Sequence, residues 1–204
     1  YVKNNLLMYR HKSQGVFACP IPQKGVVTIP DKTKILYDSA FLRCRSITKV
    51  KIPASVKKVG SAVFGYNSKL KKIVVNESSK YLKSIDGVLY SRDRKILYAY
   101  PSGKKDEVFR VPDQVCAIAD GAFIGAANLK KVIIPSRTFY VGIKCFMDCK
   151  QLREVRSEAK IKYIMDTAFI NCKKIEKYPR IKGDPKLEGS IYFVSESCSI
   201  KKET

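Results

Sequence analysis

The sequence lacks most features that enzymes and membrane proteins need. No apolar run approaches the roughly 18 residues of a membrane-spanning helix, and no charged stretch followed by an apolar one marks a secretory signal. Glycine-rich phosphate loops and the G-K-[ST] motif are missing. Histidine occurs once, as His11, where we expect a solvated hairpin loop rather than a catalytic arrangement. We therefore expect no catalytic residues, no cofactor, no small-molecule substrate and no transmembrane segment.

Acidic residues are also scarce. The 204 residues include 18 Asp and Glu against 40 Lys and Arg, a formal net charge of +22. The carboxylates are scattered, and no pair stands out for acid–base catalysis. Such a positive field attracts polyanions, yet thirty of the cations are lysines, which lack the planar fork with which arginine recognises phosphates and base edges. Two hypotheses remain: solvated lysine faces, or a polyanion-binding surface. Nucleic acid is the least favoured polyanion, because no RNA-binding motif or recognition helix is evident.

Cysteine pairs with metal or redox spacing are absent as well. None of the seven cysteines forms a C-x-x-C motif, which disfavours a zinc site or a thioredoxin-type motif. The sequence begins at Tyr1 rather than Met. We expect that an upstream segment has been removed, so the missing signal does not define a compartment.

What the sequence does contain is an internal repeat. A phenylalanine, usually after a small residue, recurs at spacings of 23, 59, 23 and 23 residues. An apolar residue lies five positions before each Phe and another lies six positions after it, and in the first four copies Val or Ile follows three positions later. The anchors are Phe41, Phe64, Phe123, Phe146 and Phe169. The longer second interval corresponds to one unit plus an insertion.

Residues 81–110 contain this insertion. Val88–Tyr90 and Ile96–Tyr98 flank a short polar loop, which predicts a β-hairpin. Residues 5–25 resemble a degraded second copy, because a Tyr and a Pro are separated by the same distance in both segments. The chain is therefore predicted to consist of two modules, each with a hairpin insert followed by repeats.

A single repeat unit cannot bury its apolar positions alone, so successive units must stack into one continuous core. The β-branched run at the end of each unit predicts a strand. Strands of adjacent coils, about 4.8 Å apart, would form a parallel sheet along one face. We therefore expect residues 1–179 to form a β-rich solenoid, and residues 180–204 to form a C-terminal cap or tail.

The repeat resembles the BspA-like leucine-rich repeats, whose form is I-P-x-x-V-x-x-I-G-x-x-A-F-x-x-C-x-x-L-x-x-V. The clearest copy matches it at Ile52, Pro53, Val56, Val59, Gly60, Phe64, Leu70 and Ile73. The D-G-V-L-Y … Y-P-x-G-K-K-D insert is a frequent companion, and the resemblance covers residues 26–179. Val63 and Cys145 replace the small Ala, and Asn67 and Ala126 replace the Cys. The resemblance implies a right-handed, curved leucine-rich-repeat solenoid in a bacterial surface or secreted protein that binds other proteins.

Three cysteines follow their Phe by three positions, namely Cys44, Cys149 and Cys172. In repeat register they should point inward. One hypothesis is a column of buried thiols that pack as small hydrophobes; the other is a metal site, or a disulfide between Cys149 and Cys172. Asn67 and Ala126 occupy the same column and would interrupt a ligand set, which favours the thiols.

The outward positions of the predicted strands are candidates for a binding face. Side chains alternate across a strand, so the residues beside each inward Val or Ile should face away from the core. Stacked coils then give a lysine ladder that Glu154 interrupts, with aliphatic residues beside it. The candidate ligand-binding residues are Lys49, Lys51, Lys72, Val74, Lys131, Ile133 and Arg156. A mixed basic and aliphatic face suits a protein ligand; the alternative is a solvated face that binds nothing in particular.

Three functions are compatible with this pattern. The leading hypothesis is a non-enzymatic cell-surface or secreted adhesion module that binds a protein ligand, such as a host extracellular matrix protein. The alternatives are binding of an acidic polysaccharide, such as a sulfated glycan or wall polymer, and a structural spacer within a larger surface protein. The cell-surface or extracellular location follows from the resemblance alone.

Overall fold

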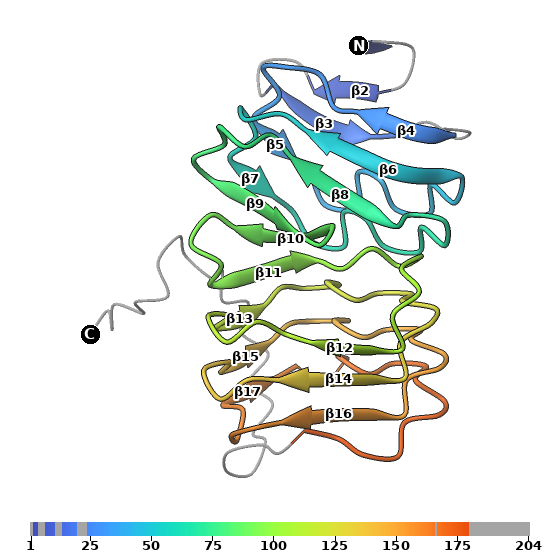
Figure 1. The fold of residues 1–204 in the computed structure, drawn as a ribbon. Helices are drawn as coiled ribbons and strands as arrows, with labels where there is room; N and C mark the ends of the chain where they lie inside the picture. Colours follow the sequence, from blue (N-terminus) through green and yellow to red (C-terminus); the bar gives the residue numbers. More distant parts are fainter. Residues whose placement is uncertain (1, 4–6, 11–13, 20–23, 166, 180–204) are drawn as a thin grey trace.

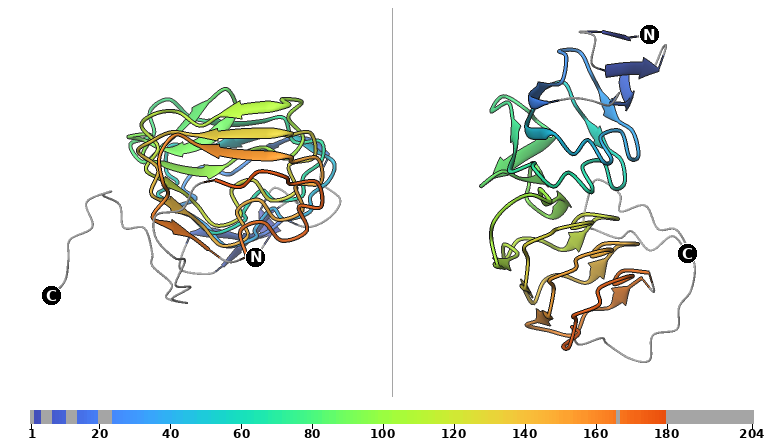
Figure 2. Two further views of the ribbon diagram at one scale, coloured as in Figure 1. Left: turned by 90° about the horizontal axis from the view of Figure 1, so that it is seen from below. Right: turned by 90° about the vertical axis from the view of Figure 1, so that its right-hand side faces the viewer.

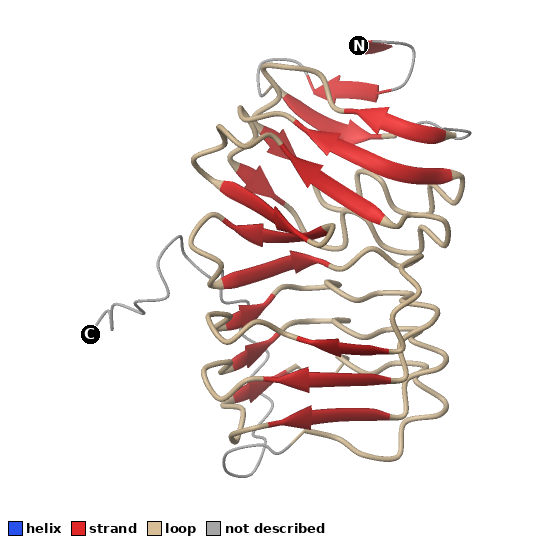
Figure 3. Cartoon of the chain, in the orientation of Figure 1, coloured by secondary structure: helices blue, strands red, loops and turns tan. Residues whose placement is uncertain are grey.

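The chain is a solenoid of short β-strands (Figure 1). A computed structural model describes residues 2–3, 7–10, 14–19, 24–165 and 167–179. No α-helix occurs in these ranges, as the colouring of Figure 3 makes clear. The coils lie one above another along a single axis, and the view along that axis in Figure 2 shows them superimposed around a common interior. The predicted fold class is therefore confirmed; the predicted cap or tail at 180–204 and His11 lie outside the described residues.

The strands fall into two modules, each with its own pair of sheets. The first module contains β1 (Val2–Lys3), β2 (Leu7–Arg10), β3 (Gly15–Ala18), β4 (Gly25–Thr28), β5 (Ile35–Leu36), β6 (Ile47–Ile52), β7 (Lys58–Val59) and β8 (Lys72–Val75). The second contains β9 (Leu82–Ile85), β10 (Val88–Ser91), β11 (Ile96–Ala99), β12 (Val108–Arg110), β13 (Ala117–Ile118), β14 (Lys131–Ile134), β15 (Tyr140–Val141), β16 (Glu154–Ser157) and β17 (Tyr163–Ile164).

Parallel sheets line two sides of the coils, whereas the sequence predicted a sheet on one. On the predicted side, β4–β6–β8 and β12–β14–β16 pair in parallel. On the other side, very short strands pair between coils, as Leu36 of β5 does with Val59 of β7. These short strands contain the apolar residue five positions before each Phe. This second row of strands therefore follows from the same repeat. Two residues per coil are too few for a strand to be recognised from sequence.

The two hairpin inserts have the same geometry. In the second module β10 pairs antiparallel with β11, and the register shifts between Leu89 and Tyr90. In the first module β2 pairs antiparallel with β3, and the register shifts between Met8 and Tyr9. In both, the second strand of the hairpin then pairs in parallel with the next coil. Antiparallel strand pairs therefore lie in both segments, around Val88–Tyr98 and in the N-terminal copy.

The anchor rings stack in the interior, but in two columns rather than one. Phe41 and Phe64 form the first, with ring centroids 5.3 Å apart. In the second, consecutive centroids are 4.9 to 5.3 Å apart. The members of the second column are Tyr100, Phe123, Phe146 and Phe169. Tyr100 precedes Phe123 by one repeat length and takes the anchor place in a sixth unit, which a search for Phe alone overlooked.

The β9–β10–β11 insert separates two hydrophobic cores. Alternate residues of β10 face opposite sides: Leu89 belongs to the core of the first module, whereas Val88 and Tyr90 belong to that of the second. All three are buried, as expected for a strand covered on both faces. Because the insert lies between β8 and β12, the sheet β4–β6–β8 runs obliquely to β12–β14–β16 (Figure 1).

Two glycines let the insert approach the last coil of the first module. Gly87 has a φ of 79°, and a Cβ there would lie 3.0 Å from Lys72 Cα. The N–H of Gly103 donates to Leu70 O at 2.9 Å, and a Cβ on Gly103 would lie 2.5 Å from Ser68 O. Glycine is required at position 87 because of its backbone conformation, and at position 103 because a side chain would collide with the backbone of the first module.

Three of the five residues that follow the Phe anchors by three positions are buried thiols, namely Cys44, Cys149 and Cys172. Cys149 Sγ donates to Phe123 O at 3.2 Å, and Cys172 Sγ donates to Phe146 O at 3.0 Å. Both are free thiols, so the structure holds no disulfide between them. Burial raises the pKa of the Cys149 thiol and keeps it protonated as a donor. These contacts fit the hypothesis of packed thiols.

Candidate functional site

The outward face of β4–β6–β8 presents two rows of side chains. Pairing aligns Lys49 with Lys72 in one row, and Lys51 with Val74 in the other. On β4, Val26 extends the first row and is 54% exposed. The inward residues between them, such as Val50 and Ile73, are fully buried. The alternation predicted from sequence therefore places cations and valines on a rigid outer surface, which we call the first face.

The outward face of β12–β14–β16, the second face, has the same architecture with different charges. Its first row runs from Val108 to Lys131 and Glu154. Lys131 Nζ lies 2.8 Å from Glu154 Oε2, so this row contains an ion pair across neighbouring coils. The nearby lysine holds the pKa of the Glu154 carboxyl below its usual range.

The second row of this face is also partly neutralised. Arg110 aligns with Ile133, which aligns with Arg156. Arg110 Nη1 donates to Glu158 Oε1 at 2.6 Å. Beside the face, Lys130 pairs with Glu107 at 2.7 Å. The second face is therefore a mosaic of both signs.

All seven predicted site residues point outward, but the structure does not bring them together. Four lie on the first face: Lys49, Lys51, Lys72 and Val74. Three lie on the second: Lys131, Ile133 and Arg156. The expected ladder that runs from Lys72 to Lys131 is wrong, because the β9–β10 hairpin interrupts the sheet between β8 and β12.

The two modules differ in how their charge is balanced. Residues 24–80 include thirteen cations and three carboxylates, and residues 81–179 include nineteen and eleven. The structure describes both partners of five ion pairs, and all of these residues lie between Asp93 and Glu158. The first face therefore keeps its positive potential, and the second loses part of it.

Sequence reasoning aligned Lys131 with Glu154 across neighbouring coils but did not recognise that this alignment forms ion pairs. Side chains at the same place in adjacent coils are separated by one repeat length, so Glu107 meets Lys130 and Lys131 meets Glu154. The same spacing puts Lys49 beside Lys72, where like charges meet. Comparing the signs of charged residues one repeat apart in the sequence would have distinguished the face with like charges from the face with ion pairs.

Nowhere in the described part of the chain do three His, Cys, Asp or Glu side chains gather as they would around a metal ion. Within the same ranges, no helix has the length and apolar character that crossing a membrane requires. What the geometry provides is surface of defined spacing and charge.

The repeats match a known family. The BspA type leucine-rich repeat region matches residues 23–90 and 98–198 in six copies. The chain belongs to this family. Six copies agree with five Phe anchors and the additional Tyr100 anchor, and a BspA type solenoid is a common scaffold for binding other proteins. Among curated proteins, none matches the chain.

Solved structures of several bacterial proteins are similar to this member of the BspA family. The pneumococcal vaccine antigen PcpA is 30% identical, with a TM-score of 0.67 over 71% of this chain and 36% of that one. A leucine-rich repeat protein of Eubacterium ventriosum is 21% identical, with a TM-score of 0.59 over 76% of this chain and 55% of that one. A leucine rich cell surface protein of Faecalibacterium prausnitzii is 21% identical, with a TM-score of 0.52 over 79% and 60%. The chain thus spans about a third to three fifths of the length of these proteins, and the latter two show the fold alone.

Proposed function

We propose that the chain is a non-enzymatic binding module whose first face recognises an acidic surface of a protein ligand. The observation that carries the proposal is the row of Lys49 and Lys72, joined by Lys51 and flanked by Val26 and Val74. Cations with aliphatic neighbours suit the rim and core of a protein interface. No carboxylate in the described ranges forms an ion pair with these lysines.

Repulsion within the first face favours a partner that carries negative charge. Like charges directly opposite each other on neighbouring strands destabilise a sheet, and Lys49 and Lys72 occupy such positions. A carboxylate placed between them relieves the repulsion and gains two charge-assisted contacts. The rigid sheet holds both lysines at a fixed spacing before binding, so little conformational entropy is lost there.

A location at the cell surface or outside the cell accompanies this function. The solved relatives include a vaccine antigen and a cell surface protein. BspA type repeats serve as interaction and adhesion scaffolds, and this analogy at the level of the fold supports binding rather than catalysis. Extracellular matrix glycoproteins, which expose acidic segments, are the partner class that we propose to test first.

The test is a biosensor measurement against a panel of purified extracellular matrix glycoproteins. The double variant Lys49→Glu/Lys72→Glu reverses the row, and we expect its affinity to fall by about tenfold or more, because two charge-assisted contacts become repulsive. Lys34→Glu/Lys58→Glu is the matched control: both lysines are exposed and lie at β5 and β7, outside the first face. Equal losses in both variants would reject the first face as the site, and binding to no member of the panel would reject the matrix as partner.

A further inference from the structure

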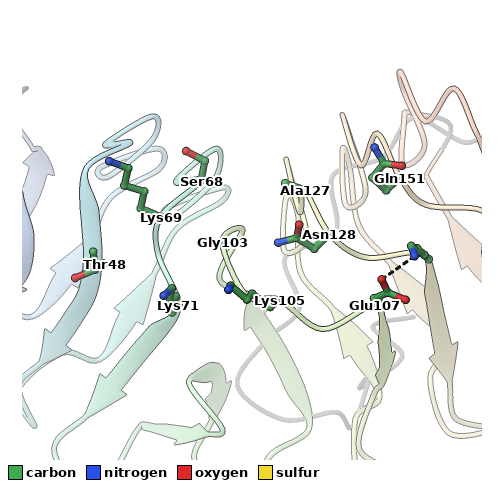
Figure 4. Close-up of a pocket in the computed structure, with 11 residues that line it drawn as sticks. Thr48, Ser68, Lys69, Lys71, Gly103, Lys105, Glu107, Ala127, Asn128 and Gln151 are labelled. Carbon is green, nitrogen blue, oxygen red and sulfur yellow. Dashed lines mark hydrogen bonds and ion pairs between the residues drawn. The ribbon is translucent and has the colours of Figure 1, made fainter.

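An open groove lies at the junction of the two modules, apart from both outward faces. Its volume is about 670 Å³. It follows the start of β6 and the loops that lead into β8, β12, β14 and β16, at the place where the hairpin insert separates the sheets. Figure 4 shows Lys69 and Lys71 on the side of the first module, Lys105 in the middle, and Asn128 on the side of the second. The buried Gly103 lies between the two sides.

The groove is positively charged, and most of this charge has no counter-ion. Lys69, Lys71 and Lys105 are exposed, and none of them forms an ion pair with another described residue. The single carboxylate of the lining, Glu107, is paired with Lys130 (dashed line in Figure 4). Three lysines in one concave surface create a potential that concentrates anions.

The remaining lining contains no large apolar side chain, which restricts the class of ligand. The lining includes no aromatic residue and no Leu, Ile, Val or Met. A protein partner usually needs an apolar or aromatic anchor at the centre of its interface, and single-stranded nucleic acid is usually held by aromatic side chains that stack on bases. Hydroxyl and amide side chains do line the groove, from Thr48, Ser68, Asn128 and Gln151. Such groups pair with the hydroxyls of sugars.

A second hollow adjoins the groove and extends the path. The two share Ser68, Ala127 and Gln151, and the second adds Arg43, Arg45 and Lys150. Its only carboxylate, Asp148, accepts a hydrogen bond from the Tyr66 hydroxyl, and Arg43 lies over the Tyr66 ring. Cations therefore continue from one hollow into the next, a layout suited to an extended ligand rather than a compact ion.

We propose that the junction groove binds a linear polysaccharide that carries sulfate or carboxylate groups. Lys69, Lys71 and Lys105 contact the anionic groups, and the amides and hydroxyls contact the sugar ring substituents. Because the insert creates the gap between β8 and β12, the site exists only where two modules meet. It is separate from the protein-binding face, so either proposal can fail without the other.

The experiment is titration calorimetry of the whole chain with three probes. These are a heparin octasaccharide, an octamer of polygalacturonate, and a single-stranded DNA that carries as many negative charges as the heparin octasaccharide. We expect the triple variant Lys69→Gln/Lys71→Gln/Lys105→Gln to weaken binding of at least one saccharide by about tenfold or more. The affinity of the variant should also fall less steeply with added salt, because fewer counter-ions are released. The saccharide that responds distinguishes sulfate from carboxylate recognition.

The matched control removes the same charge elsewhere. Lys34→Gln/Lys58→Gln/Lys83→Gln replaces three exposed lysines that do not line either hollow, and we expect less than a threefold change. Equal weakening by both triple variants, or no saccharide binding at low salt, would overturn the proposal. DNA that binds as tightly as the saccharides and responds equally to the groove variant would overturn the assignment to polysaccharide. Unchanged thermal midpoints in both variants would show that the fold is intact.

Discussion

In the first module β8 places Lys72 beside Lys49, whereas in the second module β16 places Glu154 beside Lys131. The backbone pairing is the same in both, and the hairpins even share the position of their register shift. At these paired positions the difference lies in the outward side chains. One face keeps like charges in contact and the other pairs opposite charges.

This comparison teaches that the repeat fixes the interior and leaves the surface open. The central inward position of each strand in both sheets holds Val, Ile or Phe, because it must pack against the coil above and below. The outward positions face solvent and carry either sign. Two copies of one architecture can therefore present different surfaces, and the three predictions below test how far the modules differ.

The largest expected difference concerns the aromatic columns. Phe123 contacts three other rings at centroid distances of 4.9 to 5.7 Å, whereas Phe41 contacts one at 5.3 Å. Both side chains are fully buried. Replacing a buried Phe with Ala costs about 3–5 kcal/mol; we expect Phe123→Ala near the upper end of that range and Phe41→Ala near the lower end. Urea unfolding of both variants measures the difference.

Equal losses would contradict the idea that the second column is the more tightly coupled one. The conservative Phe123→Leu serves as a control, because it keeps apolar volume and removes only the ring contacts. Its loss should fall between wild type and Phe123→Ala. A change in the slope of the urea dependence would indicate that the two modules unfold separately.

Much of the fold could be predicted from the sequence because the repeat is strict. The Phe spacing, the flanking apolar positions and the Val88–Tyr98 hairpin each follow a local rule, and the structure agrees with them. Tyr100 was missed because it replaces Phe in the anchor position, although its separation from Phe123 by one repeat length was visible. The outward direction of the seven candidate residues was also predictable from strand alternation.

The division of the site into two faces was not predictable by such rules. The division depends on how the hairpin insert packs against the coils, and tertiary packing is not encoded in local sequence patterns. Leu89 and Tyr90 face different cores although they are neighbours in sequence. The junction groove has the same origin, since its lining comes from loops of both modules.

A smaller difference between the modules lies in the column of donors behind the anchors. In the second module the column holds Ala126 and the donating thiols of Cys149 and Cys172, whereas in the first it holds Cys44 and Asn67, and Asn67 Nδ2 donates to Phe41 O at 2.9 Å. The Asn67 Oδ1 atom is buried, and among the described residues no group donates to it. A buried acceptor without a donor costs about 1–3 kcal/mol.

We therefore expect Asn67→Cys to stabilise the chain by about 1 kcal/mol, because the thiol retains the donor and removes the orphaned acceptor. The reciprocal Cys149→Asn should destabilise it by a similar amount, since it introduces that acceptor into the second module. Chemical unfolding under reducing conditions measures both. A loss of stability in Asn67→Cys would mean that Oδ1 has a partner, such as a buried water molecule.

The smallest expected effect tests the charge difference itself through pH. Lys131 lowers the pKa of the Glu154 carboxyl in the folded chain. The ion pair therefore stabilises the folded chain fully above the pKa of Glu in the unfolded chain, about 4.3. This stabilisation is lost as the pH falls through the lower pKa that Glu154 has in the folded chain. Wild type should then exceed Glu154→Gln in thermal midpoint at pH 7, and the two should converge near pH 3.

Lys72→Gln is the control in the first module, where no carboxylate pairs with the lysine among the described residues. Its difference from wild type should stay constant over this range at low salt, and a parallel convergence would remove the electrostatic distinction between the two faces.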